Sequence, residues 1–231
     1  MKKNERITYG LIITVFIFLI ANLTGKTLNL NTALIPNSFI THSVILILSI
    51  IAIFAFKTKM NYNLALPKFK TIFKPIVVGI LIALIVNILL TIIIIIMGGE
   101  IEKHPLLSQM TPLQVLIFVF FYASIAEELL FRGFLLNFLG SDNFKGITIL
   151  KRKFSTPVIT SALMFGLAHL ILLTTGVGIL FILRIVIFTF VLGLFAGYYQ
   201  EKYNNNIFAI IVHMSGNIFA VLGAFLSNMN A

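Results

Sequence analysis

The apolar segment from Pro112 to Leu139 is the feature that most constrains the fold, because three ionisable side chains lie inside a run long enough to cross a bilayer. Glu127, Glu128 and Arg132 interrupt a stretch of Leu, Ile, Val and Phe. Each ionised side chain at the centre of a membrane helix costs roughly 2.5–3.5 kcal/mol, against about 0.3–0.6 kcal/mol gained per large apolar residue. The three charges therefore cancel most of the favourable free energy with which the segment's apolar residues would insert into the membrane. We therefore expect a polar site shared with other helices to compensate.

The composition agrees with a chain that crosses the membrane repeatedly. Hydrophobic residues make up 59% of the 231 residues and charged residues only 10%, which leaves too little polar surface to cover a soluble globule. No run shows the short alternating pattern of a membrane barrel, so we predict an all-α, polytopic membrane helical bundle with about seven transmembrane helices. The predicted spans are Ile7–Leu23, Phe39–Phe56, Pro75–Met97, Pro112–Leu139, Pro157–Leu173, Val177–Tyr199 and Ile207–Leu226.

The basic residues fall mainly on one side of these spans. Lysines and arginines precede the first span and lie in the loops after the second, fourth and sixth, whereas the opposite loops hold only Lys26 and Lys103. The positive-inside rule then places the amino terminus in the cytoplasm, and we expect the first span to stay uncleaved. The net charge of +10 is attributed to topology and to contact with the lipid bilayer, and no nucleic acid is expected as a partner.

Polar groups inside the predicted spans are the candidates for function. Glu128 and Arg132 are four residues apart, so they stack on one helix face and are expected to form an ion pair. Glu127 points about 100° away around the helix, which leaves it free for chemistry. His42 and His104 lie at the ends of spans, and no partner is predicted for either.

Three further polar side chains are expected near the depth of Glu127. At 1.5 Å per residue, His169 lies about 18 Å and Asn217 about 15 Å from the cytoplasmic starts of their spans, and Glu127 lies about 18 Å before the end of its own. His213 is one turn from Asn217 on the same face. We therefore expect a carboxylate, two imidazoles and an amide to meet in a cavity in the cytoplasmic half of the bundle.

This set of groups is typical of amide hydrolysis. A carboxylate and a histidine can share and activate a water molecule, and a second imidazole with an amide N–H can stabilise the oxyanion that forms when the water attacks a peptide carbonyl. The same side chains can instead bind zinc through Glu127, His169 and His213, with water as the fourth ligand. The sequence does not decide between these two possibilities.

Two other classes of function stay open. A non-catalytic membrane scaffold or bacteriocin-immunity protein would retain the polar core for assembly alone, so Glu127→Gln and His169→Ala would leave its phenotype intact. A transporter would use the carboxylates to relay protons. The absence of internal symmetry and of Gly- or Pro-broken helices at matching positions argues against a transporter.

Three motifs, in chain order, resemble those of a known family. Glu127-Glu128-x-x-x-Arg132, Phe165-x-x-x-His169 and His213-x-x-x-Asn217 look like the motifs of the CPBP (Abi) intramembrane protease family, which includes the type II CAAX prenyl endopeptidases. The resemblance covers residues 111–226, and the first three spans resemble the family only in hydropathy.

The resemblance implies a role for each motif residue. Glu127 and His169 would activate the water, His213 and Asn217 would support the oxyanion, Glu128 with Arg132 would hold the site in shape, and Phe165 would pack beside it. The family is usually called metalloprotease, whereas for the prenyl endopeptidase branch we favour a metal-free glutamate mechanism. Zn²⁺ is therefore a possible but not a required cofactor.

Together these observations predict a single membrane domain over residues 1–231, with variable amino-terminal spans in 1–110 and the protease core in 111–227. The expected protein is an intramembrane endopeptidase of a prokaryotic cell membrane that cuts a peptide or protein substrate near the cytoplasmic face. Whether the substrate is lipidated stays open, because the prenyl endopeptidases carry a further terminal helix that is not expected before Ala231.

Overall fold

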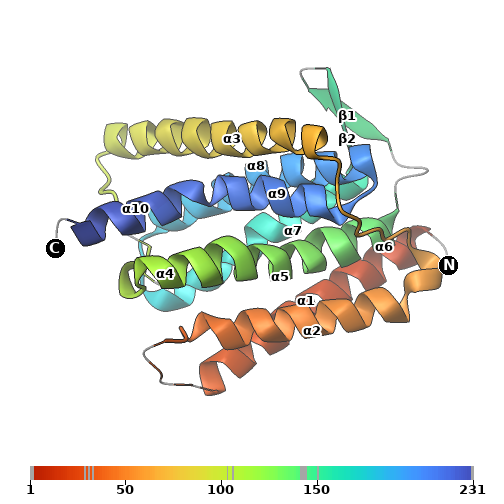
Figure 1. Cartoon of the computed structure of the whole chain (residues 1–231), viewed down its shortest axis with the longest axis horizontal. Coiled ribbons are helices and arrows are strands. Elements are labelled where there is room, and N and C mark those ends of the chain that lie inside the picture. Colours follow the sequence, from red (N-terminus) through yellow and green to blue (C-terminus); the bar gives the residue numbers. More distant parts are fainter. Residues whose placement is uncertain are drawn as a thin grey trace.

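The structure is a computed structural model that describes residues 3–28, 30, 32, 34–102, 104–105, 107–140, 145–149 and 151–229. Over these residues, seven helices are long and apolar enough to cross a membrane, which confirms the predicted all-α membrane bundle. The helices lie side by side, with the two termini at opposite ends of the bundle (Figure 1). Lys103, one of the charges used to predict the orientation, lies outside the described residues.

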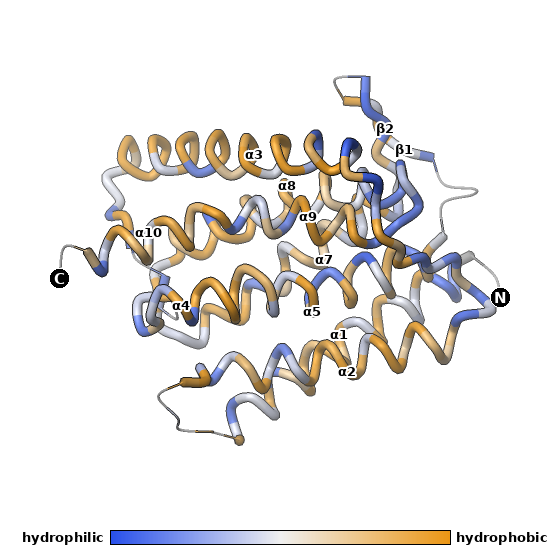
Figure 2. Tube along the Cα trace, in the orientation of Figure 1, coloured by the Kyte–Doolittle hydropathy of each residue, from blue (hydrophilic) through white to orange (hydrophobic). Residues whose placement is uncertain are grey.

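Several of the membrane spans are built from more than one element. The helices are α1 (Lys3–Thr27), α2 (Ser38–Ala55), η1 (Lys57–Lys59), α3 (Phe69–Ile96), η2 (Leu107–Gln109), α4 (Pro112–Gln114), η3 (Val115–Ala123), α5 (Ser124–Glu128), η4 (Leu129–Leu136), α6 (Asn137–Leu139), α7 (Thr156–Ala168), η5 (His169–Thr175), α8 (Ile179–Tyr203), α9 (Asn206–Gly216) and α10 (Ile218–Met229). Apolar residues dominate the long helices, and hydrophilic residues gather towards the bundle end that holds the amino terminus (Figure 2).

The fourth span, from α4 to α6, begins and ends where the sequence predicts. The Thr111 hydroxyl accepts a hydrogen bond from the Gln114 backbone N–H at 3.2 Å, and the Gln114 side chain accepts one from the Thr111 N–H at 2.8 Å. This reciprocal pair, with Pro112 at the first helical position, satisfies backbone donors that the helix cannot satisfy itself.

The fourth span is not a uniform α-helix. Two wide, π-helical segments, η3 and η4, flank the short α-helical segment α5, which carries Glu127 and Glu128. Side chains from neighbouring helices donate hydrogen bonds to backbone carbonyls in this region. Ser161 donates to the carbonyl of Phe131 at 2.7 Å, and Gln200 donates to the carbonyl of Arg132 at 2.8 Å. Such irregular backbone is tolerated inside a membrane protein because neighbouring helices satisfy it, and it occurs often at functional sites.

The third span begins six residues before its predicted start. We expected Pro75 to open this helix, but α3 begins at Phe69 and Pro75 lies inside it. The predicted start was set by hydropathy, which is low at Lys70 and Lys74. In the structure both lysines are exposed but lie within the helix. A helix can therefore extend beyond the apolar part of its own sequence.

An antiparallel hairpin between the fourth and fifth spans was not predicted. Strands β1 (Gly146–Ile149) and β2 (Arg152–Ser155) pair with Gly146 opposite Ser155, and the hairpin projects from the bundle end that holds the amino terminus (Figure 1). The hydroxyl of Ser155 then caps α7 by accepting from the Val158 N–H at 3.2 Å. The hairpin thus ends directly at the start of the helix that leads to His169.

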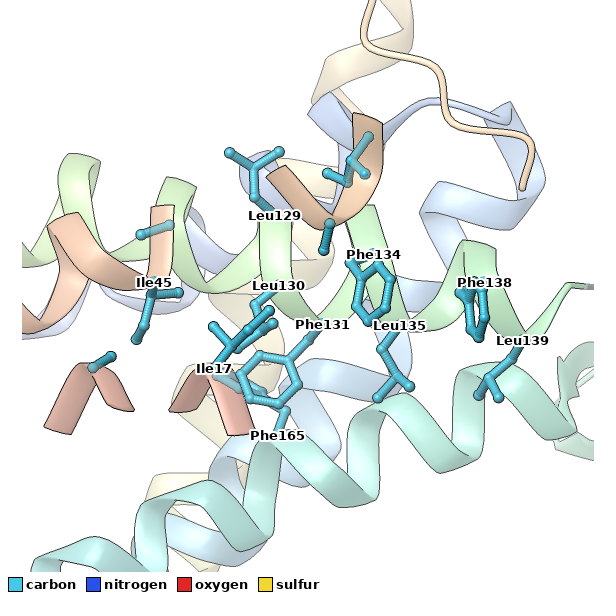
Figure 3. Close-up of a cluster of buried hydrophobic side chains, with 14 residues drawn as sticks. Ile17, Ile45, Leu129, Leu130, Phe131, Phe134, Leu135, Phe138, Leu139 and Phe165 are labelled. Atoms are coloured by element: carbon cyan, nitrogen blue, oxygen red, sulfur yellow. The ribbon is translucent and has the colours of Figure 1, made fainter. Parts of the chain in front are cut away.

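The main hydrophobic cluster fixes the fourth span against its neighbours. Leu129–Leu136 are all buried, and their side chains pack with α1, α2 and α7. The ring centroids of Phe131 and Phe165 lie 5.1 Å apart between η4 and α7, and Figure 3 shows the two side chains next to each other. The fourth span is therefore held rigidly from several sides, which is what a precisely placed polar site requires.

Candidate active site

The predicted Glu128–Arg132 pair is present and sealed from solvent. Arg132 Nη1 donates to Glu128 Oε1 at 2.8 Å, and both side chains are 0% exposed. The guanidinium carbon of Arg132 lies 4.6 Å from the centre of the Phe165 ring, which supplies a cation–π contact. Burial to this degree leaves Glu128 and Arg132 out of reach of a substrate.

Gly193 on α8 provides the space that Arg132 occupies. A Cβ atom at this position would overlap Arg132 Nη2 and approach the Ala162 backbone to 3.3 Å. Because the guanidinium is fully buried and bound to Glu128, it cannot move aside without weakening the pair.

We therefore expect Gly193→Ala to destabilise the protein by about 1–3 kcal/mol, the usual cost of overpacking. Gly223→Ala on α10 is the matched control, since its Cβ would meet no heavy atom within 4 Å. Denaturation in detergent micelles would measure both, and equal stability of the two variants would contradict the account.

Glu128 also binds an imidazole from the seventh span. His213 Nδ1 lies 2.8 Å from Glu128 Oε1, so this nitrogen carries the hydrogen that the carboxylate accepts. The opposite nitrogen, Nε2, lies 3.8 Å from Glu127 Oε2. His213 therefore bridges the two adjacent carboxylates, and the sealed one fixes how its ring faces the other.

Glu127 is the accessible member of the pair of glutamates. Its side chain is 17% exposed, against 0% for Glu128. His42 Nε2 on α2 lies 3.2 Å from Glu127 Oε1. Two imidazoles from different helices thus face the two oxygens of one carboxylate, as expected for His213 and not expected for His42.

His169 lies at the junction of α7 and η5, and its ring is fixed by Phe165. His169 Nδ1 donates to the Phe165 carbonyl at 2.9 Å, which leaves Nε2 with a free lone pair in the neutral ring. The Phe165 ring contacts the rings of His169 and His213 edge-on at 5.1 and 5.3 Å. Within the described part of the chain, no hydrogen bond or ion pair joins His169 to Glu127, although the two interact electrostatically.

Asn217 contacts the fourth span one turn before the glutamates. Helix α9 ends at Gly216, and the Asn217 side-chain amide donates to the Ser124 hydroxyl at 3.2 Å. An asparagine amide carries two N–H groups, so one remains for another acceptor. The structure therefore brings Asn217 to the segment that carries Glu127.

The zinc alternative has no support from the arrangement of these side chains. Among the described residues, no group of three or more His, Cys, Asp or Glu side chains is placed to hold a metal ion. Glu127, His169 and His213 therefore do not form such a group, although His213 Nε2 lies 3.8 Å from Glu127 Oε2.

His42 is the residue that sequence reasoning missed. No partner was predicted for it, because its place near the start of α2 suggested a position at the membrane surface. Counted from the other end of the helix, at Ala55, His42 lies about 20 Å deep, which is close to the depth of Glu127. Depth measured from the end that the Lys and Arg distribution predicts to be cytoplasmic would have found it.

His104 also has a contact that the sequence did not predict, since its ring meets Phe181 edge-on at 5.7 Å. Burial, with smaller contributions from His169 and Arg184, lowers the pKa of His104 to about 4. This loop histidine is therefore neutral near pH 7 and adds no charge beside the site.

The bundle and its centre define a polytopic membrane protein with a carboxylate–imidazole site shared between spans two, four, five and seven. Residues 109–219 match the family model described as Type II CAAX prenyl endopeptidase Rce1-like, which is consistent with the CPBP (Abi) family and confirms the resemblance. At the level of the family, this match supports a CAAX-type intramembrane protease, and the seven long apolar helices support an integral membrane protein. Searches of curated proteins and of solved structures each found no match.

Proposed function

We propose that the protein is an intramembrane endopeptidase that hydrolyses a peptide bond with water activated by Glu127 and His169. The observation that carries the proposal is the contrast within the glutamate pair. Glu128 is sealed and bound to Arg132, whereas Glu127 is partly exposed and faces imidazoles from two other helices. A bundle that needed only polar packing would have no use for the accessible carboxylate.

The first step assigned to the site is the activation of water. Glu127 accepts a proton from the water, and the free Nε2 lone pair of His169 accepts a hydrogen bond from the same molecule. The carboxylic acid so formed then gives its proton to the nitrogen of the leaving amine. Positioned general-base catalysis of this kind contributes about 10²–10⁴-fold to the rate.

The second assigned step is stabilisation of the oxyanion. Asn217 retains one N–H beyond its bond to Ser124, and a protonated His213 offers Nε2–H while its Nδ1–H stays on Glu128. Both groups project from one helix face, four residues apart. Donors fixed in this way stabilise developing charge without reorganising during the reaction.

The proposed substrate is a membrane-associated peptide or protein, cut near the cytoplasmic face of the cell membrane. The orientation follows the distribution of Lys and Arg between the loops. An apolar cavity of about 260 Å³ between α1 and α7 has Phe131, Met164 and Ala168 in its wall, and Ala168 directly precedes His169 in the sequence. This cavity favours a substrate with an apolar segment or a lipid chain beside the scissile bond.

Comparison of peptides from membranes that contain wild-type protein or Glu127→Ala tests the function. The proposal predicts peptides that appear only with the wild type and still appear when a chelator is present. Identical peptide sets would support the non-catalytic scaffold or immunity protein instead. Peptides that vanish with the chelator would contradict the metal-free mechanism.

A further inference from the structure

His42 is held in one tautomer by the backbone of its own helix. Its Nδ1 lies 2.7 Å from the carbonyl oxygen of Ser38, one turn earlier on α2. A carbonyl oxygen only accepts hydrogen bonds, so Nδ1 must carry a hydrogen. The other nitrogen, Nε2, is therefore a bare lone pair whenever the ring is neutral.

This lone pair cannot face an ionised carboxylate directly. Nε2 lies 3.2 Å from Glu127 Oε1, which is hydrogen-bond distance, and both atoms are acceptors unless one proton lies between them. The pair therefore contains one shared proton, and Glu127 can act as the base proposed for it only when His42 Nε2 holds that proton. His42 then donates a hydrogen bond that fixes one oxygen of Glu127.

The start of α2 is locked in place beside this contact. Tyr122 of η3 donates its hydroxyl to Ser43 at 2.8 Å, while Ser43 donates to the Phe39 carbonyl. The Phe39 ring stacks on Tyr122 at 5.2 Å. Two separate contacts thus hold α2 against η3 beside His42, and the ring stack of Phe39 on Tyr122 remains when the Ser43 hydroxyl is removed.

No other group replaces this contact. The other titratable groups around Glu127 are His213 on α9, 3.8 Å from the second carboxylate oxygen, and His169 at the start of η5, which interacts only electrostatically. Glu128 and Arg132, on the same span as Glu127, are bound to each other. Among the described residues, His42 makes the one hydrogen bond to the Glu127 side chain.

We infer that His42 is a positioning residue for Glu127, holding Oε1 so that Oε2 faces His213. The contact itself stands on geometry, and its catalytic consequence rests on the proposed function. His42 acts through Glu127, and no contact with the reacting peptide is assigned to it.

Infrared spectroscopy tests the contact without any substrate. The carboxylate bands of Glu127 are those lost in the difference between wild type and Glu127→Gln. We expect His42→Ala to shift these bands and His42→Gln to restore them, since the glutamine amide N–H replaces Nε2–H. His42→Asn places its amide near the Nδ1 position and should fail to restore them.

Ser43→Ala is the matched control, because it loosens α2 against η3 without removing the imidazole. Its bands should match those of the wild type. Unchanged bands in His42→Ala, or an equal shift in Ser43→Ala, would overturn the inference.

Kinetics on the peptide found in the membrane comparison tests the consequence. We expect kcat to fall about 100-fold in His42→Ala with KM little changed, and to recover in His42→Gln but not in His42→Asn. A fall in which all three variants lose activity equally, or a change in KM alone, would contradict a positioning role. If the wild type cleaves no peptide, the proposed function fails, and the infrared result still decides whether His42 holds Glu127.

Discussion

Glu127→Gln should lower kcat for peptide cleavage by about 10²–10⁴-fold, because glutamine keeps the shape of the side chain but cannot accept a proton from water. KM should change little, since the carboxylate is assigned to the reaction and not to substrate binding. The measurement is cleavage of the identified peptide by purified protein in detergent or liposomes.

Glu100→Gln makes the same chemical change at an exposed loop position and should retain wild-type activity. A Glu127→Gln protein that cleaves at the wild-type rate would remove the assignment. Loss of activity in both variants would point to a general effect of reduced negative charge.

Arg132→Met should cost about 3–5 kcal/mol of stability, because it leaves the Glu128 carboxylate buried without its cation. Methionine fills much of the volume of the arginine stem, so the loss reports mainly on charge. The double variant Glu128→Gln/Arg132→Met removes both charges together, and it should regain more than half of the loss.

Arg152→Met is the matched control for this series. Arg152 lies over the Phe195 and Tyr198 rings at 5.2 and 5.7 Å and is only partly buried. Its substitution should cost less than about 1 kcal/mol. Denaturant titration in micelles would compare the variants, and a double variant as unstable as the sum of its parts would contradict the buried-pair account.

Most of the features that the sequence predicted correctly depend on residues close together in the chain. The Glu128–Arg132 pair depends only on a four-residue spacing within one helix, and the cap at Thr111 depends only on residues three apart. Hydropathy located the seven spans, since each is longer and more apolar than a soluble core requires. These features need no knowledge of how the helices are arranged.

Contacts between distant spans were harder to predict. His42 and Glu127 are 85 residues apart, and only the packing of α2 against the fourth span brings them together. The hydrogen bond between His213 and Glu128 also joins residues that are 85 positions apart. It was not predicted, because Arg132 already neutralised the charge of Glu128. Depth along the membrane normal was the usable signal, and it succeeds only when each helix is measured from the same side.

The π-helical segments of the fourth span were also not predicted. The depth estimates assumed 1.5 Å per residue, whereas η3 and η4 are wider turns that rise less per residue.

The hairpin of β1 and β2 was not predicted, because its lysines and arginine were counted as charges of a loop.

Single-turnover cleavage in water labelled with oxygen-18 is the measurement that tests the central claim most directly. If Glu127 acts as a base on water, the new carboxyl terminus of the peptide carries one labelled oxygen and the Glu127 side chain carries none. An unlabelled product together with a labelled Glu127 would show that the carboxylate itself attacks the peptide bond, and would contradict the account.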